Sequence, residues 1–161
     1  MSNMGLERYL NANDIQLVRT SVGDRYVVEE MRKGGYNLGG EQSGHIVMSD
    51  YVTTGDGLMA GLQFLNAVVS SGMKASKLAN IFEPVPQLLK NVSFERSRDP
   101  MNADNVKNAI ADGEAKLGKA GRLLIRASGT EPVIRVMGEA DDAALLEKVI
   151  DQVVDAVANA A

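Results

Sequence analysis

The sequence predicts an α/β protein, with a mixed α/β domain followed by a small α+β domain made of a sheet and helices. Three observations carry this prediction. Short β-branched segments alternate with helix-period apolar segments through the first half. Pro84 and Pro86 then interrupt the chain, and two such residues cannot lie inside one helix. The second half repeats strand and helix patterns of its own, so we expect domains at 1–88 and 89–161.

The first half begins with a helical turn over residues 4–10. Residues 15–18 alternate and are β-branched, which favours a strand. A helix is expected over 25–32, ended by the Gly34-Gly35 pair, and residues 45–48 have the pattern of a second strand.

The next segment has the clearest helical periodicity of the first half. A stripe of apolar residues at helical spacing is expected to be buried: Leu58, Leu62, Leu65, Val68 and Val69. Gly72 ends this helix, and a short helix over 77–82 follows. Asp56 precedes the helix and is interpreted as its N-cap, since one carboxylate is too few for a magnesium site.

The second half predicts a strand over 88–94, a helix over 102–117, and strands over 121–125 and 133–137 joined by a loop. A long amphipathic helix over 141–158 closes the chain. Its apolar face comprises Leu146, Val149, Ile150, Val153, Val154 and Val157.

Composition excludes several classes of function. The net charge of −4, the pI near 5.0 and the aromatic content of 4% disfavour a nucleic-acid-binding module. The 161 residues include no cysteine, which excludes disulfides, thiolate zinc sites and cysteine nucleophiles, and fits a reducing cytosol. No run of 18 apolar residues occurs, so no membrane span is expected.

Residues 126–132 are the most informative segment. Arg126 closes an apolar strand, and Ser128 and Thr130 flank Gly129 before the next strand begins. Positive φ at Gly129 would let backbone N–H groups converge on an anion, while hydroxyl groups and a planar guanidinium suit phosphate oxygens. Arg135 on the return strand is expected close to the loop. The competing interpretation is an ordinary polar hairpin turn.

A second candidate is the glycine-rich segment 39–45. Glu41 can accept hydrogen bonds from sugar hydroxyls, and Ser43 can donate and accept them. His45, the one histidine of the sequence, has a side chain suited to phosphate binding and proton transfer. The alternatives are a flexible turn and a structural histidine.

Four segments in a fixed order resemble the α-D-phosphohexomutases across nearly the whole chain. They are Val-Gly-Asp-Arg-Tyr-Val at 22–27, Gly-Glu-Gln-Ser-Gly-His at 40–45, Thr-Gly-Asp-Gly at 54–57, and Arg-Ala-Ser-Gly-Thr-Glu-Pro at 126–132 running into Ile-Arg-Val at 134–136. The resemblance implies most of the family's domain 3 at 1–88 and all of its domain 4 at 89–161.

The resemblance also assigns roles to residues. It implies that Glu41 and Ser43 hold sugar hydroxyls, that His45 lies beside the reacting groups, and that Arg25 faces the cleft and assists. The phosphate that is not transferred would be held by Arg126, Ser128, Gly129 and Thr130, with Arg135 in support.

Two family motifs do not occur in this sequence: the Thr-Ala-Ser-His-Asn-Pro-type loop with the phosphorylated serine, and the Asp-Gly-Asp-Gly-Asp-Arg loop that holds magnesium. We therefore expect a fragment without nucleophile or metal ligands, inactive alone, whose partners are the two N-terminal domains of the same enzyme and a phosphorylated amino sugar.

Within the family, the chain resembles the bacterial members that interconvert glucosamine 6-phosphate and glucosamine 1-phosphate. The resemblance implies a cytoplasmic, magnesium-dependent isomerase that works through a phosphoserine and a bisphosphate intermediate and feeds UDP-N-acetylglucosamine and cell-wall synthesis. The alternatives are a phosphomannomutase or phosphoglucomutase of the same family, and a stand-alone phosphosugar-binding module.

Overall fold

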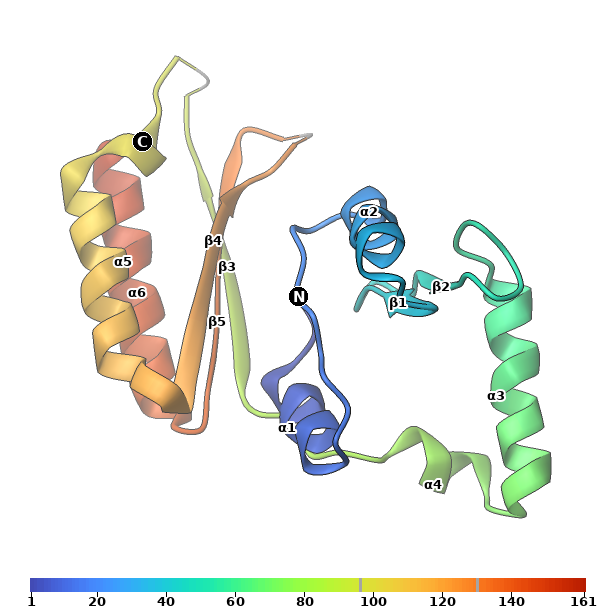
Figure 1. The fold of residues 1–161 in the computed structure, drawn as a ribbon. Coiled ribbons are helices and arrows are strands. Elements are labelled where there is room, and N and C mark those ends of the chain that lie inside the picture. The colour runs from blue at the N-terminus through green and yellow to red at the C-terminus, as the bar shows by residue number, and fades with distance from the viewer. Residues whose placement is uncertain (96, 130) are drawn as a thin grey trace. The chain divides into compact units, whose positions relative to one another are not determined.

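The computed structural model describes residues 1–95, 97–129 and 131–161. The chain divides into two compact units, Met1–Glu83 and Pro84–Ala161, each with helices and a small antiparallel sheet (Figure 1). The predicted mixed α/β fold class is confirmed. The units are described separately below.

The first unit contains four helices and one hairpin. The helices are α1 (Met4–Ala12), α2 (Asp24–Gly34), α3 (Gly57–Ser71) and α4 (Ala75–Ala79), and the hairpin pairs β1 (Leu38–Gly40) with β2 (Ile46–Met48). Its core is small and joins α2 to the hairpin through Val27, Met31 and Val47. A Cβ atom at Gly39 would lie 2.4 Å from Sδ of Met31, so only glycine allows this close approach.

The strand predicted at 15–18 is wrong for this chain, because these residues form no ladder. A strand needs the hydrogen-bonding groups of a neighbouring strand. No described segment pairs with residues 15–18, and Ile15 is 53% exposed.

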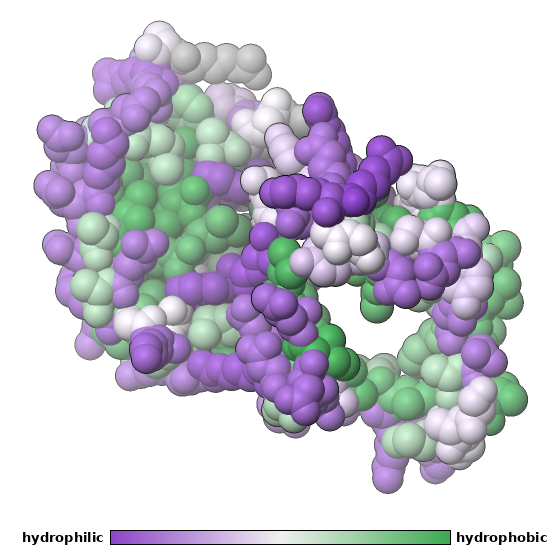
Figure 2. All heavy atoms as spheres, viewed as in Figure 1, coloured by the Kyte–Doolittle hydropathy of each residue, from purple (hydrophilic) through white to green (hydrophobic). Residues whose placement is uncertain are grey.

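The buried stripe predicted for α3 is also wrong, although the helix itself is confirmed. No residue of α3 is buried, and Leu58, Leu62 and Val69 are 75%, 52% and 81% exposed. Figure 2 shows the resulting hydrophobic surface over α3. The periodicity correctly marked a helix with an apolar face, but the described part of this chain does not bury that face.

The second unit is a three-stranded sheet with both of its long helices on one face (Figure 1). Its elements are β3 (Gln87–Ser93), the 3-10 turns Pro100–Asn102 and Gly118–Ala120, α5 (Asp104–Leu117), β4 (Gly121–Ala127), β5 (Val133–Ala140) and α6 (Ala143–Ala160). The strand order is β3-β5-β4 and all pairs are antiparallel. Val136 of β5 and Ile150 and Val153 of α6 are fully buried, so α6 closes the core as the sequence predicts.

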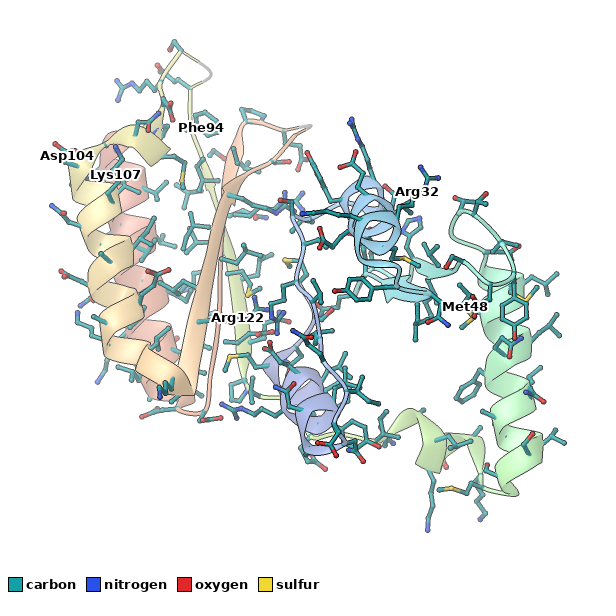
Figure 3. All side chains as sticks on the ribbon, in the orientation of Figure 1. Arg32, Met48, Phe94, Asp104, Lys107 and Arg122 are labelled. Carbon is teal, nitrogen blue, oxygen red and sulfur yellow. The ribbon has the colours of Figure 1, made fainter. Side chains whose placement is uncertain are left out.

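Because strand side chains alternate, the other face of this sheet has three rows of residues that each span all three strands. One row is Gln87, Glu139 and Arg122; the middle row is Leu89, Met137 and Leu124; the last row is Asn91, Arg135 and Arg126. Arg122 and Phe94, which are labelled in Figure 3, lie toward opposite ends of the sheet.

The first row is an ion pair around a fully buried carboxylate. Glu139 is 0% exposed, and its Oε2 accepts a hydrogen bond of 2.7 Å from Nε of Arg122. Its Oε1 accepts another, of 3.0 Å, from Nε2 of Gln87. Charge and hydrogen-bond partners therefore come from both flanking strands, as a buried carboxylate requires.

We predict that Arg122→Met lowers the free energy of unfolding of the second unit by about 3 kcal/mol, because it removes the Arg122 charge that pairs with the buried Glu139 carboxylate. The double variant Arg122→Met/Glu139→Leu should recover much of this loss. Urea denaturation followed through NMR signals of residues 84–161 measures both. Equal losses in the single and double variants would contradict a role for the charge pair.

Candidate functional site

The segment 40–45 forms a tight turn between β1 and β2. The N–H of Glu41 donates to the carbonyl of His45 (2.8 Å), and the N–H of Gly44 donates to the carbonyl of Glu41 (3.0 Å). Gly44 has φ of 99°, which favours glycine. The turn brings Oγ of Ser43 to 3.5 Å and Oε2 of Glu41 to 3.8 Å from Nδ1 of His45. Three of the predicted site residues are thus neighbours.

Glu41 is anchored by the N-terminus of α2. Its Oε1 accepts a hydrogen bond of 3.0 Å from the N–H of Gly23, the N-cap residue, which has no side chain to cap the helix. A carboxylate at a helix N-terminus is electrostatically favourable. This contact orients Oε2 toward His45. The sequence analysis did not predict the contact between Glu41 and Gly23. A signal for it was present, because a glycine at the N-cap position has no side chain to accept hydrogen bonds from the first N–H groups of the helix.

Arg25 is not joined to this turn. Its side chain is 80% exposed, and Nε donates to Oε1 of Glu29 one helical turn later (2.9 Å). This hydrogen bond raises the pKa of Arg25, with the charge of Glu29 adding to the effect. The cleft-facing role that the family resemblance implied for Arg25 stays a prediction.

The Thr-Gly-Asp-Gly segment lies against the same hairpin. Gly55 bridges Val47 of β2, and a Cβ at Gly55 would lie 3.4 Å from Cδ2 of His45. The side chain of Asp56 accepts a hydrogen bond from the N–H of Met59 (2.9 Å), so the predicted N-cap is confirmed. Asp56 thereby starts α3, and its carboxylate is engaged by the backbone.

Within the described residues, no group of three or more acidic or histidine side chains is arranged to hold a metal ion. None of the helices in these residues combines the length and the hydrophobicity that a membrane span needs.

The second candidate site is the end of the sheet where β4 and β5 are connected. The N–H of Ser128 donates to the carbonyl of Val133 (2.9 Å), and the N–H of Phe94 donates to the carbonyl of Pro132 (3.0 Å). These contacts fix the base of the loop to all three strands. Arg126 and Arg135 lie directly opposite each other in the β4–β5 ladder, on the face away from the helices.

Two like charges in directly opposed positions destabilise a sheet. The neutralisation available in the structure is weak. Nη2 of Arg135 lies 3.6 Å from Oε2 of Glu131, a side chain that is 63% exposed. Nη1 of Arg126 donates to the carbonyl of Ala127 at 3.5 Å. Nε of Arg135 is buried, and no described residue accepts a hydrogen bond from it. The pair therefore offers two guanidinium groups to an anion.

The positive φ expected at Gly129 is not observed. A Cβ at Gly129 would meet no atom within 4 Å, so the loop is open there. Thr130, which was predicted to contribute a hydroxyl group, lies outside the described residues. Among the described residues, the register places the side chains of Arg126 and Arg135 at this end of the sheet.

Comparisons with known proteins match both halves of the chain. Residues 1–85 match the family model described as phosphoglucomutase/phosphomannomutase, alpha/beta/alpha domain III, and residues 89–156 match its C-terminal domain. The chain is 67% identical over 157 residues to phosphoglucosamine mutase of Ruegeria sp. (strain TM1040), covering 98% of this chain and 35% of that protein. It is 61% identical over 161 residues to phosphoglucosamine mutase of Methylorubrum extorquens, covering 100% of this chain and 36% of that protein.

Solved structures share the fold at low identity. N-acetylphosphoglucosamine mutase of Aspergillus fumigatus superposes with a TM-score of 0.82 at 19% identity, over 99% of this chain and 37% of that one. A phosphoglucomutase/phosphomannomutase family protein of Burkholderia thailandensis gives 0.71 at 23% identity, over 98% of this chain and 36% of that one. The chain thus spans little more than a third of the length of the proteins it matches.

We predict that Arg126→Gln raises the free energy of unfolding of the second unit by about 0.5 kcal/mol in low-salt buffer without phosphate, because it removes the like-charge pair. In the original chain, inorganic phosphate should raise the melting temperature more than chloride at the same ionic strength, and this difference should disappear in the variant. Lys119→Gln, which removes a cation elsewhere in the unit, is the control. A phosphate effect that survives Arg126→Gln would contradict the site.

Proposed function

Because the chain belongs to the phosphoglucomutase/phosphomannomutase family, we propose that it is the substrate-recognition part of a phosphoglucosamine mutase. The full-length enzyme interconverts glucosamine 6-phosphate and glucosamine 1-phosphate through a phosphoserine and a bisphosphate intermediate. The observation that carries the proposal is the opposed pair of Arg126 and Arg135 at the loop of residues 127–132. The repulsion between these two positive charges destabilises the sheet, and an anion bound between them would neutralise it.

The proposal assigns phosphate recognition to residues 89–161. Arg126 and Arg135 supply planar forks of donors that match phosphate oxygens, with the hydroxyl of Ser128 and the open backbone at Gly129 beside them and Thr130 as a further donor. Such a site contacts the phosphate group and does not distinguish which carbon of the sugar bears it. A mutase needs this property, because its sugar presents first one phosphate and then the other for binding.

The proposal assigns sugar recognition to residues 1–88. Oε2 of Glu41 and the hydroxyl of Ser43 are acceptors for sugar hydroxyl or amino groups, and both lie within 4 Å of His45 Nδ1. His45 and Arg25 would act beside the reacting groups. The anchoring of Glu41 by Gly23 lowers the entropic cost of holding the carboxylate in place.

Nucleophile and metal belong, on this proposal, to the two domains that precede these in the full-length enzyme. One N-acetylphosphoglucosamine mutase of the same fold was solved with GlcNAc-6P and magnesium. The described residues of this chain offer no ligand set for magnesium, so its chemistry is assigned to those domains. The absence of cysteine and the phosphorylated substrate favour a cytoplasmic enzyme.

We predict that Glu41→Ala in the full-length enzyme lowers kcat/KM for glucosamine 6-phosphate at least tenfold, because charge-assisted hydrogen bonds of about 1.5–3 kcal/mol are lost. Glu41→Gln keeps an acceptor for Gly23 and separates the anchor from sugar recognition, so it should retain stability but not activity. Glu30→Ala is the matched control on α2. Unchanged kinetics in Glu41→Ala would reduce the turn to a structural element.

The same assay decides between members of the family. The full-length enzyme should prefer glucosamine phosphates to glucose and mannose phosphates in kcat/KM. A preference for mannose or glucose phosphates would replace the proposed substrate but keep the phosphate site.

We predict that the 161-residue chain alone shows no turnover of glucosamine phosphates with magnesium and a bisphosphate activator, because positioning and metal electrostatics carry phosphoryl transfer. A coupled assay against a blank without protein measures this. Turnover above that blank would show that the nucleophile lies in this chain.

A further inference from the structure

We propose that Asn91 is a positioning residue for Arg135 and completes the anion site from the third strand. The inference rests on the proposed function, since it concerns the same site. Neither the comparisons nor the sequence patterns assign a role to Asn91.

The sheet register places Asn91 beside the site. β5 is the central strand, so Arg135 has two direct neighbours on its face: Arg126 of β4 and Asn91 of β3. Val92 and Ile134 point into the core beneath the helices, so Asn91 and Arg135 both lie on the opposite face. Directly opposed side chains have Cβ atoms about 4.5–5.5 Å apart, within reach of an amide and a guanidinium group.

Arg135 has a donor that needs such a neighbour. Its Nε atom is buried, and no described residue accepts a hydrogen bond from it. Leaving a buried donor without a partner is unfavourable. Asn91 is exposed on the surface of the sheet. Its Oδ1 atom is therefore an acceptor directly opposite a donor in need of one.

The two features fit together when an anion is bound. If Oδ1 of Asn91 accepts a hydrogen bond from Nε of Arg135, the guanidinium plane is fixed and both η nitrogens remain for phosphate oxygens. A guanidinium group held in one plane gives bidentate contact at lower entropic cost. The row Asn91, Arg135 and Arg126 then acts as one unit, in which Asn91 orients Arg135 and the two arginines bind the phosphate.

Asn91→Leu removes the acceptor and keeps the side-chain volume on an exposed strand position. Inorganic phosphate titrated into the 161-residue chain should bind about tenfold more weakly to this variant, since a hydrogen bond to a charged group is lost. Asn91→Gln, which retains an amide oxygen, should recover most of the affinity. Ser93→Ala removes a polar group from the same strand and face, opposite Val133, and should bind phosphate as the original chain does.

The arginine Nε–H signals in NMR spectra give a readout that a purely structural role would not change. Arg135→Lys identifies the Arg135 signal. Phosphate should slow the exchange of this proton with water in the original chain and in Asn91→Gln, but not in Asn91→Leu. Circular dichroism and melting curves show whether each variant is folded, and Asn91→Ala replaces Asn91→Leu if the latter is not.

The outcomes separate this inference from the proposed function. Phosphate binding by the original chain with unchanged affinity in Asn91→Leu would overturn the role of Asn91 and leave the anion site in place. A lack of any specific phosphate binding by the original chain would overturn both. Weaker binding in Asn91→Leu, with recovery in Asn91→Gln and the change in Nε–H exchange, supports the inference.

Discussion

The register of β5 between β3 and β4 is the constraint on which the second unit depends. One alternation of side chains sends Ile134, Val136 and Gly138 to the helices and sends Arg135, Met137 and Glu139 to the other face. A shift of one residue would exchange the two sets and would bury charge beneath α6. The apolar requirement of the core therefore also fixes where the charged side chains lie.

The two ends of the sheet face that lies away from the helices use charge in opposite ways. Glu139 faces Arg122 and Gln87, so its charge and hydrogen bonds are satisfied within the protein. Arg135 faces Arg126, and its contact with Glu131 is long and exposed. The sequence could have placed a carboxylate opposite Arg135 as it did opposite Arg122. The poorly neutralised Arg126–Arg135 pair lies at a loop, four residues along the same two strands from the satisfied Arg122–Glu139 pair, which is typical of a binding site and not of a scaffold.

How much could be predicted from the sequence depended on whether the deciding contacts were local. Asp56 was assigned correctly because an N-cap depends on residues three positions apart. The helices of the second unit were correct because their periodic faces meet a sheet within the same unit. The strand predicted at 15–18 and the burial predicted for the apolar face of α3 were wrong. A sequence pattern shows which neighbours a segment needs, whereas strand pairing and burial depend on whether other segments supply them. The family domain that residues 1–85 match is described as alpha/beta/alpha, and the matched relatives are nearly three times as long as this chain.

The candidate sites show the same limit at the level of single residues. The loop 126–132 was found from its composition, and Arg135 from its distance along the chain, but the direct opposition of Arg126 and Arg135 needed the register. The contact between Glu41 and Gly23 joins residues 18 positions apart, and no local pattern marks it. The expected positive φ at Gly129 failed because a glycine permits that conformation without requiring it. The proposed phosphate recognition therefore rests on side chains held by the ladder more than on loop backbone, and on that proposal the strand neighbours of Arg135 belong to the site.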